Sequence, residues 1–471
     1  MICACLQHSA RTQQPLPVVL ANAPYQRAEL PIEDRVRDLL SRMTVAEKAR
    51  QLDMYRGVSP SIGDDAQKTA DEIKTHGFRP EDADKVWGTL GVGSIHDLYE
   101  EPVFNNAIQQ WVIKNTRLGI PVLFAEEGLH GFSTGTIFPA QINLAAAWNR
   151  ELATHTAAAI AAEARATGVD MLFAPVLDLA REPRWGRVEE DFGEDPYLTG
   201  QMGLAYVDGF QGDSLASDHT VVAEPKHFAG HGSPESGTNT SPVHIGEREL
   251  RTVMLKSFEP SFRVGHARAT MAAYHEIDGI PVTADPFLLK TILRQEWGFM
   301  GFVLSDLGAI RRLYDTHRVA ASPEAAVVMA INAGVDMQFY DFDHETFQHA
   351  IIHGIQSGPL TLEALDRAVS DVLRVKFELG LFDHPLVDPN LNQQVHRSPD
   401  HLQVSPESAL QSMTLLKNDN HLLPLSKELE QIAIIGPNAK AHAMATMPPS
   451  RERRPTTTSF LKSNNCFRTP T

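Results

Sequence analysis

Cysteine is scarce in this sequence. The chain has 3 cysteines among 471 residues, two of them close together as Cys3 and Cys5. So few cysteines cannot form a disulfide framework, and no zinc-type cysteine spacing recurs later in the chain. Long apolar runs are also missing, because charges or prolines interrupt every stretch that approaches the roughly 20 residues of a membrane helix. We therefore expect free thiols and no integral membrane protein.

Positive charge is in short supply as well. The sequence carries 42 Lys and Arg against 59 Asp and Glu, which gives a formal net charge of −17. Such a surface repels a polyanion, so neither nucleic acid nor an acidic membrane is expected as a partner. A neutral substrate suits this charge better. The hydrophobic share of 42% is ordinary for a soluble globular protein, and the length suits one large domain plus part of a second.

The N-terminus gives a weak targeting signal. Residues 15–23 (PLPVVLANA) end in an A-x-A pattern, but the apolar run is too short for a secretory h-region. We treat residues 1–29 as an N-terminal segment in which disorder is expected. The compartment, secreted or periplasmic locations included, and the oligomeric state stay open.

From about Leu30 the sequence alternates helical stretches with short apolar runs. Residues 31–55 are expected to be helical with a break at Met43, since Thr44 and Glu47 have the spacing of a capping box. Later helices are expected at 151–167, 323–333 and 362–379. The apolar runs that we interpret as strands are 92–95, 122–125, 171–175, 220–223, 270–273, 302–305 and 335–337.

Parallel strands joined by helices form either a doubly wound sheet or a closed barrel. The span of about 350 residues and the number of strands favour an α/β fold of the (β/α)8 TIM-like barrel type over residues 30–382. In such a barrel the chemistry lies at the carboxyl ends of the strands.

The sequence changes character after Gly380. Residues 383–412 are rich in Pro, Asn and Asp and predict a linker. Residues 413–438 are expected to start a second α/β sandwich domain, with the apolar run 432–435 as its first strand. Residues 439–471 contain six Lys or Arg and almost no aliphatic residues, so we expect a disordered tail and an incomplete, truncated second domain.

Polar clusters follow four of the expected strands: AEEGLHG at 125–131, REPRWGR at 181–187, KHFAGHG at 226–232 and SDLGA at 305–309. Alone, each of them is typical of a helix cap or a surface charge. On one face together they would combine carboxylates, a Lys-His pair, an arginine and an aromatic ring. Neutral sugars require this mixture, because each hydroxyl needs both a donor and an acceptor. A carboxylate kept ionised by Lys or Arg can act as a nucleophile at an anomeric carbon.

With these motifs the sequence resembles the family-3 glycoside hydrolases, a group of β-glucosidases, β-xylosidases and related exo-acting enzymes. GIPVLFAEEGLHG, FAPVLDLAREPRWGRVEEDFGEDPYL, KHFAGHG, MAAYHEIDGIPVTAD and GFVLSDLGAI occur in the family's order over roughly residues 30–438. The resemblance implies retaining hydrolysis of non-reducing terminal β-D-glycosides in carbohydrate catabolism. It also implies a small neutral sugar or oligosaccharide as substrate, and neither a cofactor nor a metal.

The resemblance further assigns site residues. Asp306 is the expected catalytic nucleophile. The residues expected to line the subsite for the non-reducing sugar are Glu127, Arg187, Lys226, His227, Met271 and Tyr274. Glu127 would accept hydrogen bonds from hydroxyls, Arg187 and Lys226 would donate, and Tyr274 would steady Asp306 through its hydroxyl.

The sequence departs from the family pattern in two places. Leu307 stands where many relatives have a tryptophan beside the nucleophile. The glutamate that serves as general acid/base in the glucosidase and xylosidase branch is expected to be missing, since the one Glu after residue 435 is Glu452 in the tail. A further branch uses a histidine in a D-S-H motif instead. Here Asn239 falls about where that histidine would stand, so a glucosidase-like or xylosidase-like substrate is favoured over an N-acetylhexosaminide.

Two rival interpretations remain. His227 and His231 are four residues apart, so with Glu224 or Glu235 they might bind a metal in a metallohydrolase. However, Gly230 and its neighbours favour a turn over a helix there. The second rival is a sugar-binding or catalytically impaired remnant with a formed barrel and no complete catalytic pair.

Several other polar residues have plain explanations. Asp178 is expected to bond Arg181 or a backbone turn, and the acidic run 189–191 is expected to be solvated. Trp185 is equally compatible with the core or with helix packing.

Overall fold

Eight parallel segments close into a ring in the computed structural model, which describes residues 22–57, 78–97 and 101–433. Five strands pair in chain order: β1 (Met54–Arg56), β2 (Ser94–His96), β3 (Leu123–Glu126), β4 (Met171–Leu172) and β5 (Val222–Ala223). Phe228, which follows β5, pairs with Ala272 of β6 (Ala269–Ala272), and β6 pairs with β9 (Phe302–Ser305). Met337 then pairs with Leu304, and Gln338 pairs with Asp53 beside β1. The predicted (β/α)8 barrel is confirmed.

The first strand is where the sequence-based prediction fails. The break at Met43 and the capping box are confirmed, because α1 (Ile32–Arg42) ends there and α2 (Val45–Gln51) begins after Thr44 with both reciprocal bonds to Glu47. The prediction of a helix up to residue 55 is wrong, since 54–56 form β1. Residues 52–55 are all buried, Asp53 included, so this stretch has no alternation of buried and exposed positions that separates strand from helix.

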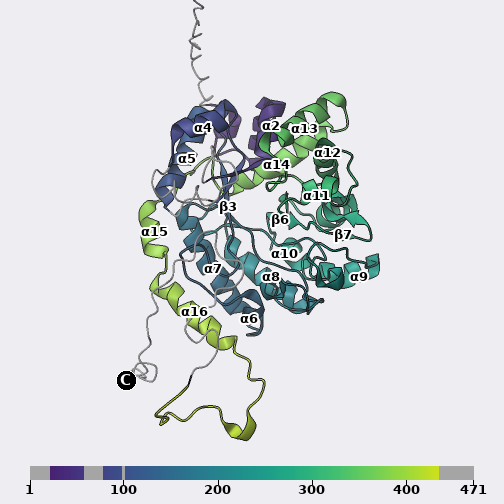
Figure 1. Cartoon of the computed structure of the whole chain (residues 1–471). Helices are drawn as coiled ribbons and strands as arrows, with labels where there is room; N and C mark the ends of the chain where they lie inside the picture. The colour runs from purple at the N-terminus through teal and green to yellow at the C-terminus, as the bar shows by residue number, and fades with distance from the viewer. Residues whose placement is uncertain (1–21, 58–77, 98–100, 434–471) are drawn as a thin grey trace, which may run out of the picture.

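Helices surround the barrel strands (Figure 1). The predicted helices at 151–167, 323–333 and 362–379 are confirmed to within one residue. In the described part of the chain, the α-helices after α2 are α4 (Pro80–Val86), α5 (Pro102–Asn115), α6 (Gln141–Ala145), α7 (Arg150–Thr167), α8 (Pro196–Gln211), α9 (Glu247–Thr252), α10 (Glu259–Arg263), α11 (Ala309–Asp315), α12 (Pro323–Ala333), α13 (His344–Ser357), α14 (Leu362–Glu378), α15 (Pro389–Val395) and α16 (Pro399–Gln411).

Shorter elements complete the described part of the chain. An antiparallel hairpin, β7 (Glu276–Ile277) and β8 (Ile280–Pro281), was not expected from the sequence. A π-helix, η7 (Phe287–Glu296), precedes β9. The 3-10 turns are η1 (Pro24–Gln26), η2 (Gly88–Leu90), η3 (Val188–Glu190), η4 (Glu235–Gly237), η5 (Met254–Lys256), η6 (Val282–Ala284) and η8 (Asp419–His421).

The segments on either side of the barrel partly pack on it. Tyr25, inside the expected N-terminal segment, is buried and donates its hydroxyl to the Leu118 carbonyl oxygen at 2.9 Å. The connector 383–412 contains α15 and α16, and the buried Glu163 of α7 holds it by accepting from His401 Nδ1 and from the Arg397 N–H, both at 2.9 Å. This connector is therefore an ordered part of the barrel surface.

The expected second domain stays a prediction. Residues 413–433 contain the turn η8 and no strand among the described positions. The strand expected at 432–435 continues into 434–471, which lie outside the described residues, as does the expected tail at 439–471.

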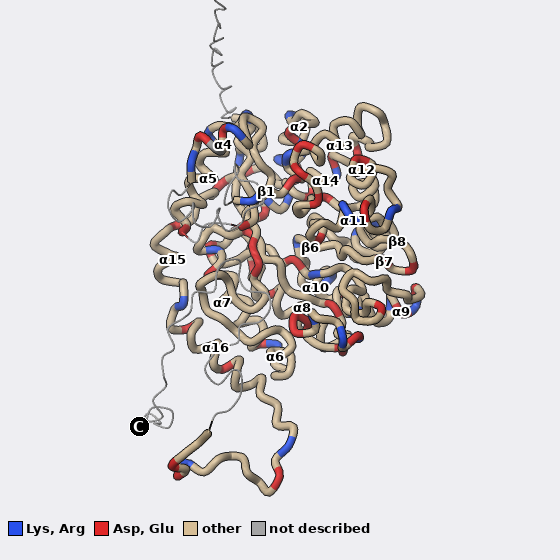
Figure 2. The backbone as a smooth tube through the Cα atoms, in the orientation of Figure 1, with Lys and Arg blue, Asp and Glu red and all other residues tan. Residues whose placement is uncertain are grey.

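Charged residues of both signs are spread over the described structure. In the view of Figure 2, acidic and basic residues are interspersed along the backbone. Among the residues that the structure describes, no helix has both the length and the apolar character needed to cross a bilayer.

One buried side chain ties the amino-terminal ends of β2 and β3 to the carboxyl end of α2. Lys376 of α14 has no exposed surface, and its ammonium group donates to Gln51 Oε1 at 2.7 Å, to the Gly93 carbonyl at 2.7 Å and to the Pro121 carbonyl at 2.8 Å. Gly93 and Pro121 stand just before β2 and β3, and Gln51 is the last residue of α2. Lys376 thus fixes the amino-terminal end of β3, whose opposite end carries the polar cluster 125–131.

We predict that Lys376→Met destabilises the barrel. Methionine keeps much of the volume but leaves Gln51 Oε1 and the Pro121 carbonyl without this donor, at about 1–3 kcal/mol for each unsatisfied group, while the Gly93 carbonyl still accepts from the Leu123 N–H. Because burying the charge is itself unfavourable, we expect a net loss of roughly 2–4 kcal/mol in the free energy of unfolding, measured by urea denaturation. Lys417→Met is the matched control, since that side chain is 77% exposed. Equal stability of K376M and wild type would contradict the assigned role.

Candidate active site

Asp306 stands directly after β9, at the carboxyl end of the barrel. Its N–H donates to the Ala272 carbonyl of β6 at 3.0 Å, and the Leu307 N–H donates to Asp306 Oδ1 at 2.6 Å. Gly308 follows with φ of 73°, a left-handed conformation that favours glycine and turns the chain into α11. Asp341 fixes this turn by accepting from the Ser305 hydroxyl and the Ile310 N–H.

The second carboxylate oxygen of Asp306 is available for chemistry. Among the described residues, Oδ2 has no hydrogen-bond partner. The Nε2 atom of His227 lies 3.8 Å from it. Burial raises the pKa of Asp306 to about 6, while Arg187, the Leu307 N–H and Lys226 oppose that rise. At pH 7 the carboxyl group is therefore mostly ionised and has one oxygen free.

Lys226 and Glu127 form a pair at the carboxyl ends of β5 and β3. Lys226 Nζ lies 3.1 Å from Glu127 Oε2, and the lysine side chain is almost fully buried while that of Glu127 is 24% exposed. Glu127 thus presents carboxylate surface to the site and is held by a buried cation. The sequence placed both residues here, and the structure brings them together.

Arg187 is the most connected group of the site. Its guanidinium donates twice to Glu190, at 2.9 Å each, once to the Tyr274 hydroxyl at 2.9 Å and once to His227 Nε2 at 3.0 Å. A fifth, longer contact of 3.4 Å reaches His231 Nε2. A guanidinium has five N–H groups, so every donor is engaged. The expectation that Arg187 donates directly to sugar hydroxyls is not supported by this geometry.

The contacts of Arg187 determine the protonation of His227. Because a guanidinium only donates, His227 Nε2 must accept, and the ring proton must be on Nδ1. Nδ1 lies 2.7 Å from Asp178 Oδ2, which accepts this proton. Burial, with Arg187 second, lowers the pKa of His227 well below its usual range. His227 is thus a neutral side chain whose lone pair points at Arg187.

Two sequence-based interpretations are corrected by these contacts. Asp178 bonds His227, and not Arg181 or a backbone turn. The acidic run 189–191 is not uniformly solvated, since Glu190 and Asp191 are buried. Glu190 accepts two hydrogen bonds from Arg187. The spacing of Arg187 and Glu190, three residues apart, is the signal that the sequence contained for this pair.

Trp185, Asn239 and Tyr274 form a chain of hydrogen bonds that ends at Arg187. The Tyr274 hydroxyl accepts from Arg187 and also from Asn239 Nδ2 at 2.7 Å, and Trp185 Nε1 donates to Asn239 Oδ1 at 2.9 Å. Tyr274 makes no direct hydrogen bond to Asp306 in the structure. Trp185 is a buried site residue whose ring also packs edge-on against His231 at 4.9 Å between centroids.

The remaining predicted residues lie around this centre. Met271 is buried in β6 and belongs to the core, paired in register with Leu304 of β9. Leu307, the residue directly after Asp306, has a side chain that is 53% exposed. The sequence analysis missed an aromatic group at the other strand ends, in which His96 packs against Phe173 and Phe339 at 5.3 and 5.2 Å between ring centroids.

The geometry does not favour a metal between His227 and His231. The Nε2 atom of each ring faces the Arg187 guanidinium, so a metal cation there would meet a fixed positive charge. Glu235 lies on η4 and pairs with His244 instead. Among the described residues, the one group of three potential ligands is His96, Asp97 and Glu126, which includes neither histidine of the rival site.

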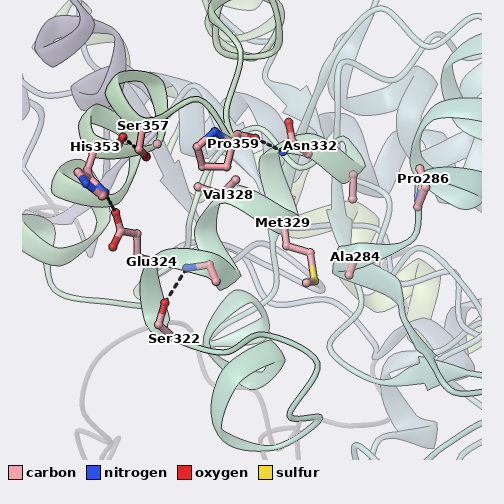
Figure 3. Close-up of a pocket in the computed structure, with 13 residues that line it drawn as sticks. Ala284, Pro286, Ser322, Glu324, Val328, Met329, Asn332, His353, Ser357 and Pro359 are labelled. Carbon is pink, nitrogen blue, oxygen red and sulfur yellow. Dashed lines mark hydrogen bonds and ion pairs between the residues drawn. The ribbon is translucent and has the colours of Figure 1, made fainter.

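A hollow on the outer surface between α12 and α13 is separate from the strand ends (Figure 3). It is lined by apolar side chains such as Val328 and Met329, with the Glu324–His353 ion pair at one end. No predicted site residue borders it. The candidate active site is therefore the cluster around Asp306.

We predict that Lys226→Met raises the pKa of Asp306 above about 6. Lys226 lowers this pKa by its charge, so its removal favours the protonated carboxyl group. The measurement is a 13C NMR titration of aspartate-labelled protein, with the Asp306 signal assigned by its loss in D306N. Lys256→Met, at an exposed position of η5, is the control and should leave the titration unchanged. A lowered or unchanged pKa of Asp306 in K226M would contradict the effect assigned to the charge of Lys226.

The chain is similar to known proteins over most of its length. The family described as "Glycosyl hydrolase family 3 N terminal domain" matches residues 44–375. A putative β-xylosidase from Formosa agariphila is 36% identical over 429 residues, which cover 88% of this chain and 55% of the relative. A β-glucosidase structure from Erythrobacter marinus has a TM-score of 0.77 and 32% identity, covering 86% of this chain and 53% of the other. A glucose complex of a β-glucosidase from Listeria innocua has a TM-score of 0.74 and 32% identity, covering 84% and 53%. The chain thus spans about half the length of these relatives, and it belongs to glycosyl hydrolase family 3.

Proposed function

We propose that this chain hydrolyses non-reducing terminal β-D-glycosides, of the β-glucosidase or β-xylosidase type, with Asp306 as nucleophile of a retaining mechanism. The observation that carries the proposal is the free Oδ2 of Asp306, held at a strand end between the Lys226–Glu127 pair and the Arg187–Tyr274 pair. The relatives named above are β-xylosidases and β-glucosidases, which supports this substrate class.

The reaction would proceed in two displacements at the anomeric carbon. In the first, Asp306 Oδ2 forms an ester bond to that carbon while the bond to the leaving oxygen breaks, and the leaving oxygen takes up a proton. In the second, a water molecule loses a proton and attacks the same carbon, which releases the Asp306 carboxylate. Two inversions retain the configuration of the sugar.

Binding of the sugar is proposed for the polar side chains that still have free capacity. Glu127 would accept from hydroxyls with its exposed carboxylate surface, and Lys226 would donate to a hydroxyl in the same subsite. His227 and Tyr274 would border the sugar beside Asp306. Since all donors of Arg187 are engaged, we propose that it orders these groups, while Met271 supports the floor from the core.

The proton for the leaving group has no evident source in the described part of the chain. Around Asp306, Glu127 is paired with Lys226, Asp178 with His227, and Glu224 has no exposed surface. The alternative function therefore remains a catalytically impaired or sugar-binding unit. In either case we propose 30–382 as the unit that forms the site, with the linker at 383–412, the start of a second domain at 413–438 and a tail at 439–471.

We predict that a 2-deoxy-2-fluoro glycosyl fluoride labels Asp306. The fluorine slows the second displacement more than the first, so the ester accumulates and mass spectrometry of peptides locates it. D306N should lose both the label and activity on aryl glycosides, by roughly a thousandfold or more. Asp315→Asn, at an exposed position of α11, is the control and should be labelled like wild type. A label on another carboxylate would overturn the assignment.

We also predict an asymmetric dependence on the leaving group. Without a proton donor, departure of a poor leaving group slows by about 10²–10⁴, while a dinitrophenolate departs without this help. Dinitrophenyl β-glycosides should therefore turn over slowly and cellobiose hardly at all, as measured by release of phenolate and of glucose. Rapid cleavage of cellobiose by the purified chain would show that it does contain an efficient acid.

A further inference from the structure

Asn239 comes from a loop that is tightly fixed against the barrel. Gly237 has φ of 70°, and a Cβ atom there would lie 2.7 Å from the Arg184 Cβ, so this part of the loop lies directly on the segment that leads to Trp185. Further along, the Val243 N–H donates to the Glu276 carbonyl at 2.9 Å. Asn239 itself is exposed at the mouth of the site, between these two anchor points.

The orientation of the Asn239 amide follows from its two partners. The indole N–H of Trp185 can only donate, so the amide atom that faces it at 2.9 Å must be the carbonyl oxygen. The amide nitrogen therefore faces the Tyr274 hydroxyl at 2.7 Å and donates to it. This assignment rests on chemistry and is independent of how the two amide atoms are distinguished.

Two donors then occupy the Tyr274 oxygen. Arg187 donates from one side at 2.9 Å and Asn239 from the other. A phenolic oxygen has two lone pairs, so both are used, and its own proton must point in the remaining direction. Arg187 also donates to His227, whose Nε2 lies 3.8 Å from Asp306 Oδ2, so Tyr274 and this oxygen border the same group of side chains. Asp306 Oδ2 has no hydrogen-bond partner among the described residues, and Asp306 is the carboxylate whose charge acts most strongly on the pKa of Tyr274.

We propose that Asn239 is a positioning residue, which by donating to the Tyr274 hydroxyl directs the phenolic proton toward the Oδ2 side of Asp306. The inference rests on the proposed function of Asp306 as nucleophile. A proton held in this direction stabilises the ionised, attacking form of the carboxylate and the same charge as it leaves the sugar in the second displacement. Asn239 acts through Tyr274 and touches neither Asp306 nor its charge directly.

An asparagine meets this requirement better than its close relatives. An aspartate would accept the Tyr274 proton and turn it away from Asp306. A neutral histidine has one donor and one acceptor on opposite sides of a rigid ring, so it would need both distances to match at once. The amide offers a donor and an acceptor on one short, rotatable group between Trp185 and Tyr274.

Other ionisable groups lie around Asp306, and replacing Asn239 removes none of them. They come from the loops after β3, β4 and β5 and from the segment before η3, and they are Glu127, Asp178, Arg187, Glu224, Lys226 and His227. A shift in the titration of Asp306 on replacing the neutral Asn239 by another neutral residue therefore reports the hydroxyl of Tyr274.

The test is a double-mutant cycle on the full chain, with the variants N239A, Y274F and N239A/Y274F. The readout is the 13C carboxyl titration of Asp306, assigned with D306N. We expect N239A to raise the pKa of Asp306 by about half a unit, because the phenolic dipole is then no longer held toward the carboxylate, and Y274F to raise it at least as much. In the Y274F background the N239A change should have no further effect.

Thr238→Ala, at an exposed position of the same loop, is the matched control and should titrate like wild type. Because Asn239 is exposed, its truncation leaves no cavity, and thermal unfolding of each variant checks this. A wild-type titration in N239A, or a shift of equal size in the Y274F background, would overturn the proposal. The titration requires no turnover, so failure of the fluoroglycoside to label Asp306 would refute the proposed nucleophile while the cycle still decides the role of Asn239.

Discussion

The guanidinium of Arg187 is the constraint from which the rest of the site follows. It cannot accept a hydrogen bond and stays charged at any relevant pH, so each group that it contacts must present a lone pair or a negative charge. Glu190 supplies the charge, and His227, His231 and Tyr274 supply lone pairs. One side chain thereby fixes two histidine tautomers and the acceptor role of a tyrosine.

This arrangement has an electrostatic consequence for Asp306. The site contains more buried carboxyl groups than buried cations, and burial raises the pKa of both Glu224 and Asp191 well above the usual range. Asp306 differs from these two groups because Arg187 and Lys226 both oppose the rise in its pKa that burial causes, while Glu127 adds to that rise.

The sequence predicted the barrel and which polar motifs meet at the carboxyl ends of its strands, because both depend on local patterns. Short apolar runs followed by charged motifs identify strand ends, and the (β/α)8 topology brings those ends to one face. It failed where a residue's partner is distant in the chain. Asp178 and His227 are 49 positions apart and Asn239 and Tyr274 are 35 apart, so neither bond is marked by spacing. β1 was missed because burial on both faces removes the alternation that distinguishes a strand.

The groups known to act on the ionisation of Asp306 all lie in the proposed barrel unit. They come from segments between β3 and α11, and Lys376 holds the opposite ends of β2 and β3 from within the same barrel. The exposed side chains of Leu307 and Asn239 belong to this network, because the Leu307 N–H donates to Asp306 Oδ1 and Asn239 donates to the Tyr274 hydroxyl. A proton donor that approached beside these two residues would therefore act on the environment of the proposed nucleophile as well as on the leaving oxygen.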